Sequence, residues 1–160
     1  MRFYLADRIT KLDVGTGLEG EKTWPYNDDV FRDHFPGYPV VPGVLLIESS
    51  AQLGGILVED SFAQKYSTQA RKIFAILGIV RLAKFKKFVR PGERVDFKIT
   101  LTDLSRHTAS IDVAGLVLDE KRYQASIAYT LIPDSKGDNP RGREAHEEYR
   151  NFLLQGLRNG

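Results

Sequence analysis

The sequence predicts an α+β domain in which one long buried helix is followed by a run of antiparallel strands. Val44–Asp60 carries apolar residues on nearly every face, which is typical of a helix enclosed by the rest of its domain. From Val95 to Leu101 apolar and polar residues alternate, as in a strand with one buried face. The length of 160 residues suits a single domain.

Further strand-like segments flank the helix, and turn residues separate them. These segments are Arg8–Val14, Leu18–Trp24, Ile73–Ala83, Ser110–Leu118 and Tyr123–Ile132. Gly15 and Gly17 lie between the first two, which predicts a hairpin there. Ser105-Arg106 and Asp119-Glu120 are the predicted hairpin turns of the later strands.

The C-terminal part has a different composition. Pro133–Arg143 is rich in residues typical of linkers, and beyond it Ala145, Tyr149 and Leu153 recur at helical spacing. We therefore expect residues 1–133 to form one domain. Residues 134–160 are expected to form a linker and an amphipathic helix that packs on the domain or on a partner subunit.

Composition excludes several classes of function. The absence of cysteine excludes disulfides and thiolate catalysis and suits a reducing compartment. No run of about 18 apolar residues is present, which predicts that there is no membrane span. A net charge of +2 gives no support to nucleic-acid binding. We expect a cytoplasmic protein with no nucleic-acid partner.

The stretch from Asp33 to Gly43 contains three prolines and two glycines, which fix its backbone path tightly. His34 lies at the start of this stretch, and a tightly fixed loop suits a positioned side chain. The loop leads into the buried helix, whose first residues, Gly43 and Val44, have free backbone N–H groups. Such groups can hold a developing negative charge.

Glu48 follows about one turn into the helix, where burial disfavours a charged carboxylate and makes it a candidate proton donor. With His34 as a base, the segment could remove a proton beside a thioester carbonyl and expel a hydroxyl group two carbons away. Ordinary alternatives are a hydrogen-bonded loop histidine and a glutamate that interacts with the helix dipole. His107 and His146 lack such a setting and are predicted surface residues.

This stretch resembles the signature of the 3-hydroxyacyl-(acyl carrier protein) dehydratases of the FabZ type. There, His-Phe-Pro-Gly-x-Pro-Val-x-Pro-Gly precedes a helix that bears the acid and an Ala-Gln pair. All these positions are matched, and His34 and Glu48 are separated by fourteen positions (48 − 34). The resemblance extends from about Tyr4 to Ile132. It implies a hotdog fold, in which an antiparallel sheet wraps a long central helix, and a homodimer or higher homo-oligomer.

The resemblance also implies a role for each motif residue. His34 would be the base, Glu48 would protonate the departing hydroxyl, and the N–H groups of Gly43 and Val44 would bind the thioester oxygen. The acid would reach across the dimer to the histidine of the other chain. The substrate would be a 3-hydroxyacyl chain on the phosphopantetheine of acyl carrier protein, and the product a trans-2-enoyl thioester in fatty-acid synthesis. No metal and no other cofactor is expected.

A basic cluster follows the motif. It contains five cations and no acid, and its members are Arg81, Lys84, Lys86, Lys87 and Arg90. Lysine on a strand edge discourages aggregation, which is the simplest interpretation. An acidic carrier protein would give the cluster a further role in steering the partner.

Two other functions remain open at this stage. A hotdog thioesterase would hydrolyse the thioester instead of dehydrating the acyl chain. A non-catalytic acyl-binding subunit of a hetero-oligomer would perform neither reaction. The complete spacing from His34 to Glu48 favours the dehydratase over both alternatives.

Overall fold

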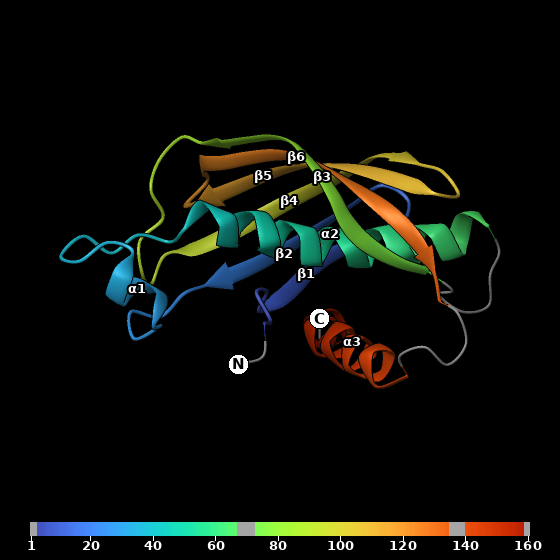
Figure 1. Cartoon of the computed structure of the whole chain (residues 1–160), viewed down its shortest axis with the longest axis horizontal. Coiled ribbons are helices and arrows are strands. Elements are labelled where there is room, and N and C mark those ends of the chain that lie inside the picture. The colour runs from blue at the N-terminus through green and yellow to red at the C-terminus, as the bar shows by residue number, and fades with distance from the viewer. Residues whose placement is uncertain (1–2, 67–72, 135–139, 159–160) are drawn as a thin grey trace.

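A computed structural model describes residues 3–66, 73–134 and 140–158 (Figure 1). The strands are β1 (Arg8–Asp13), β2 (Gly17–Thr23), β3 (Ile73–Phe85), β4 (Arg94–Leu104), β5 (Thr108–Val117) and β6 (Glu120–Pro133). The helices are α1 (Val30–Asp33), α2 (Gly43–Lys65), α3 (Pro140–Leu153) and α4 (Gln155–Arg158). The predicted hairpin of the first two strands is confirmed, since β1 and β2 are antiparallel.

One sheet and one long helix make the core. The strand order is β1-β2-β4-β5-β6-β3, and all neighbouring strands are antiparallel. The sheet curves around α2 (Figure 1), whose residues Leu53, Ile56 and Leu57 are almost completely buried. The predicted α+β arrangement, a buried central helix wrapped by an antiparallel sheet, is therefore confirmed.

The start of α2 follows from its sequence. Pro42 is the N-cap residue, and its φ of −57° is compatible with the turn into a helix. The helix then continues to Lys65, five residues beyond the predicted end at Asp60. Ser61 and Phe62 in this last part are buried, so packing extends the helix past the apolar run.

The strand β3 lies at one edge of the sheet and pairs with β6 alone among the described strands. Several of its apolar side chains are exposed, although Ile73 at its start is buried. Ile76 is 47% exposed, Ile79 57% and Val80 39%. A long apolar edge strand is a surface on which another chain can pair.

The C-terminal helices pack against the body of the domain. Tyr149, Leu153 and Leu154 belong to the hydrophobic core, and Arg150 Nη2 lies 2.6 Å from Asp60 Oδ2 on α2. The helix α3 begins at Pro140, within the segment expected to be a linker, while residues 135–139 lie outside the described residues.

Two details differ from the prediction. His146 is only partly exposed, and it is not a free surface residue, because its Nε2 lies 2.8 Å from Oε2 of the buried Glu59. Amphipathic spacing predicts which face of a helix is buried, but it does not predict a polar partner such as Glu59 on another helix. The last hairpin turns at Leu118 and Asp119, one residue earlier than predicted, and both have positive φ. Leucine rarely adopts that conformation, so the sequence gives no sign of it.

Candidate active site

The loop that carries His34 is a short hairpin closed by its own backbone. Phe35 and Tyr38 exchange two hydrogen bonds, with N···O distances of 3.2 and 2.9 Å, and the N–H of Val40 donates to the His34 carbonyl at 3.1 Å. Gly37 has a φ of +76°, a conformation that glycine adopts readily. These backbone hydrogen bonds and the turn at Gly37 hold the loop in a defined conformation.

The imidazole of His34 is held in one orientation. Its Nδ1 lies 3.0 Å from the carbonyl oxygen of Val40, and its ring stacks on Phe35 with centroids 4.2 Å apart. A carbonyl oxygen only accepts hydrogen bonds, so Nδ1 carries the hydrogen in the neutral ring. The lone pair is then on Nε2, which is the arrangement that a general base needs.

A pocket of about 400 Å³ opens beside His34. It is lined mainly by apolar side chains from the loop, from the start of α2 and from the segment after β3. The lining residues are His34, Phe35, Val40, Val41, Gly43, Val44, Leu46, Ile47, Phe85, Lys87, Phe88 and Val89. An apolar pocket with one titratable ring suits a molecule with an apolar chain and one reacting group.

Gly43 and Val44 both line this pocket, at the N-terminus of α2. Backbone N–H groups in a first helical turn have no carbonyl partner within the helix, so they can donate to a ligand. Gly43 also allows a close approach. A Cβ atom at this position would lie only 2.6 Å from Cζ of Phe85. A side chain here would therefore displace the Phe85 ring.

Glu48 lies outside this group within a single chain. It is not among the pocket-lining residues that the structure describes. Its Oε1 instead accepts a hydrogen bond from Nε2 of Gln52 at 3.0 Å. The side chain is half-buried, not fully buried as the sequence suggested. No role for Gln52 was predicted from the sequence, although its spacing of one helical turn from Glu48 is typical of interacting pairs.

All five residues of the basic cluster are exposed. Lys87 lines the His34 pocket and pairs with Glu120. The guanidinium of Arg90 lies over the ring of Tyr38 in the His34 loop, 5.5 Å from its centroid. Two members of the cluster, Lys87 and Arg90, are therefore next to the pocket or its loop, a placement that the sequence did not establish.

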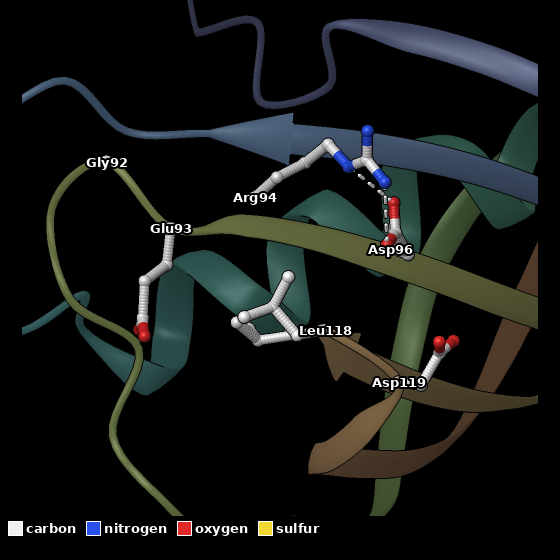
Figure 2. Close-up of a pocket in the computed structure, with 7 residues that line it drawn as sticks. Gly92, Glu93, Arg94, Asp96, Leu118 and Asp119 are labelled. Carbon is white, nitrogen blue, oxygen red and sulfur yellow. Dashed lines mark hydrogen bonds and ion pairs between the residues drawn. The ribbon is translucent and has the colours of Figure 1, made fainter.

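A second hollow, of about 540 Å³, lies near the start of β4 and the turn between β5 and β6 (Figure 2). Arg94 pairs with Asp96 there, at 2.9 Å between Nε and Oδ1. None of the predicted catalytic residues lines it.

The described residues include neither a metal-binding cluster nor a membrane-spanning helix. They contain no group of three or more His, Cys, Asp or Glu side chains placed to hold a metal ion. Over the same ranges, no helix is both long enough and apolar enough to cross a membrane.

Comparison with known proteins identifies the family. The model of the FabA-like domain matches residues 1–126. This chain belongs to the FabA-like family. A 3-hydroxyacyl-[acyl-carrier-protein] dehydratase FabZ of Campylobacter jejuni is 40% identical to this chain over 99 residues. The match covers 62% of this chain and 66% of the relative, so this chain spans just under two thirds of the relative's length. The FabZ of Pediococcus pentosaceus is 33% identical over 82% of this chain and 85% of the relative. The predicted resemblance is confirmed.

Solved structures show the same fold as this FabA-like chain. A Streptococcus mutans protein bound to acetyl CoA has a TM-score of 0.61 at 12% identity, and the match covers 81% of this chain and 90% of that one. A mutant thioesterase of Pseudomonas aeruginosa has a TM-score of 0.60 at 17% identity, over 79% and 81% of the two chains. The predicted hotdog fold is confirmed, and identities this low carry the fold alone.

Proposed function

We propose that this chain removes water from 3-hydroxyacyl thioesters carried on acyl carrier protein and releases trans-2-enoyl thioesters. Its membership of the FabA-like family and its FabZ relatives support this reaction. The observation that carries the proposal is the contact between His34 Nδ1 and the Val40 carbonyl, which leaves Nε2 free as a base. This base shares one apolar pocket with the helix N-terminus.

The reaction balances with the residues present. His34 Nε2 takes a proton from C2 of the acyl chain, while the N–H groups of Gly43 and Val44 stabilise the negative charge that develops on the thioester oxygen. The electron pair left at C2 forms the double bond to C3, and the C3–O bond breaks. Glu48 gives its proton to the departing hydroxyl, which leaves as water. His34 then returns its proton to the ionised Glu48, through water, before the next turnover.

The acid comes from a second copy of the chain in this proposal. Glu48 is not among the residues that line the His34 pocket of its own chain, which supports an acid supplied by a partner protomer. The exposed apolar side chains of β3, among them Ile76 and Ile79, offer a surface for a symmetric partner. We infer a homodimer that joins its two sheets at β3, with each site built from His34 of one protomer and Glu48 of the other.

Acyl carrier protein is the partner that we infer for the basic cluster. The cluster is exposed and Lys87 lines the pocket, so a carrier bound there could extend its phosphopantetheine toward His34. Charged surfaces of opposite sign raise association rates more than they raise affinity. We also propose that the protein acts in fatty-acid synthesis and is located in the cytoplasm.

A product assay tests the function directly. Purified protein is incubated with 3-hydroxyacyl carrier substrates of several chain lengths, and the products are measured by mass spectrometry. Loss of one water molecule supports the dehydratase, whereas loss of the acyl group indicates a thioesterase. Binding without any change in mass indicates an acyl-binding subunit. His34→Ala, with His107→Ala as the matched control on an exposed turn, separates catalysis at this site from a contaminating activity.

A further inference from the structure

Both the oxygen and the nitrogen of the Gln52 side-chain amide make two hydrogen bonds each. Its Oε1 accepts from the N–H of Leu5 at 2.9 Å and from the hydroxyl of Tyr149 at 3.1 Å. Its Nε2 donates to the carbonyl of Phe3 at 2.9 Å and to Oε1 of Glu48 at 3.0 Å. The backbone partners have fixed donor and acceptor roles, so the amide has only one orientation that satisfies all four.

Tyr149 brings the C-terminal helix α3 into this network. Its hydroxyl accepts from the N–H of Ala6 at 2.8 Å. Its single proton has two acceptors, Gln52 Oε1 at 3.1 Å and the Ala6 carbonyl at 3.3 Å, and the shorter contact is to Gln52. Burial raises the pKa of Tyr149, so the hydroxyl keeps its proton near neutral pH. The ring is fixed as well, stacked on Tyr4 with centroids 4.2 Å apart.

The orientation of Gln52 decides which oxygen of Glu48 can carry a proton. Because Nε2 of Gln52 donates to Oε1 of Glu48, Oε1 acts as an acceptor. The proton of the neutral acid is then on Oε2. Reversal of the amide would turn a carbonyl oxygen toward Oε1, and the proton would be drawn to that side. A group that holds the amide in place therefore holds the acid ready to donate from Oε2.

We propose that Tyr149 of the C-terminal helix is a positioning residue for the acid Glu48 and acts through Gln52. This proposal rests on the dehydratase function and on Glu48 as its acid. It gives α3 a purpose in catalysis beyond packing. A residue about a hundred positions away from Glu48 in the sequence (149 − 48 = 101) would then set the geometry of proton donation.

Tyr149→Phe tests this role, because it removes the hydroxyl and keeps the stacked ring. Tyr4→Phe is the matched control: it removes a hydroxyl from the other ring of the same stack, and the hydrogen bonds of Gln52 do not involve Tyr4. With the full-length protein and a 3-hydroxyacyl carrier substrate, we expect Tyr149→Phe to lower kcat about tenfold at nearly unchanged KM. Tyr4→Phe should leave both constants within about twofold of wild type.

A double-mutant cycle with Gln52→Ala separates positioning from general stability. If Tyr149 acts through Gln52, adding Tyr149→Phe to Gln52→Ala should lower kcat no further. Should thermal unfolding show that Gln52→Ala is not folded at the assay temperature, Gln52→Met replaces it and keeps the side-chain length. Equal kcat for Tyr149→Phe and Tyr4→Phe, or losses that multiply in the double variant, would overturn the proposal. If the wild-type protein does not dehydrate the 3-hydroxyacyl substrate, the proposed dehydratase function itself is overturned.

Discussion

The two halves of the proposed active site are built in different ways. The base half is almost entirely local, because a hairpin of seven residues, His34 to Val40, holds the imidazole and leads directly into α2. The acid half is assembled from distant parts of the chain. Glu48 is held by Gln52, which is held in turn by the N-terminal segment at Phe3 and Leu5 and by Tyr149 near the C-terminus.

This difference separates what a motif determines from what the whole fold must supply. Local hydrogen bonds can fix the tautomer of His34 whatever surrounds the loop, provided that the prolines and glycines remain. The acid depends on the docking of α3, so changes far from the motif can alter it. Variants of the base half should therefore change catalysis without changing stability, whereas variants at the α3 contact should change catalysis, stability or both.

Apart from the base and the acid themselves, the largest effect in a single position is expected at Gly43 in the base half. A valine there places its side chain against Phe85, since even a Cβ atom would lie 2.6 Å from the ring. Disturbed N–H groups should lower kcat by about 10²–10³, the usual cost of losing an oxyanion donor. Thermal unfolding of Gly43→Val should stay close to wild type, because Phe85 is half-exposed and can move. Near-normal turnover would mean that the thioester oxygen is bound elsewhere.

The basic cluster should produce an intermediate effect that depends on the substrate. Lys84→Glu combined with Lys86→Glu should raise KM for the carrier-bound substrate about tenfold, while short soluble thioesters are spared. Added salt should weaken carrier binding in the wild type, because exposed charges are screened within about 10 Å at 0.1 M. Lys87 is left unchanged because it pairs with Glu120 and lines the pocket.

Lys11→Glu with Lys98→Glu is the matched control for this charge reversal. Both lysines are exposed, one on β1 and one on β4, and the change in net charge is the same. A similar rise in KM for the carrier-bound substrate in the control pair would show that the overall charge of the protein, and not the basic cluster, causes the effect. Equal losses on soluble and carrier-bound substrates would remove the partner explanation.

The smallest effect is expected from pH at the contact between α3 and α2. The hydrogen bond to Glu59 raises the pKa of His146 above 6.5, with Glu147 acting in the same direction and burial and Arg143 opposing it. A raised folded-state pKa means that the charged ring stabilises the fold fully below the unfolded value. That contribution is lost as pH rises through the raised pKa.

His146→Gln measures this contribution, with His107→Gln as the exposed control. The free energy of unfolding should fall by on the order of 1 kcal/mol at about pH 5.5, and the difference from wild type should shrink toward about pH 9. A difference that is constant with pH would show that the charge of His146 does not hold the helix.

Prediction from the sequence succeeded where local rules decide the structure. The apolar residues on all faces of α2 and the alternation in β4 predicted the fold. The motif predicted a tightly turned loop at His34. These features depend on residues close together in the chain, where periodicity and turn chemistry apply.

Features that depend on long-range contacts were not predicted. Helical spacing marked Tyr149 as apolar, yet its hydroxyl bonds to Gln52, 97 positions away. His146 was placed on the surface because nothing near it in the sequence points to Glu59. The exposed apolar side chains of β3 likewise cannot be told from buried ones in a strand of this composition, because only the sheet order places β3 at an edge.

Mixed dimers test the shared site most directly. His34→Ala and Glu48→Gln should each be almost inactive as pure proteins. After subunits of the two variants exchange, half of the dimers are mixed, and each mixed dimer has one intact site in two. About a quarter of wild-type activity should therefore return, if the two sites act independently. Demonstrated exchange with no recovered activity would contradict the account and would assign His34 and Glu48 to a site within one chain.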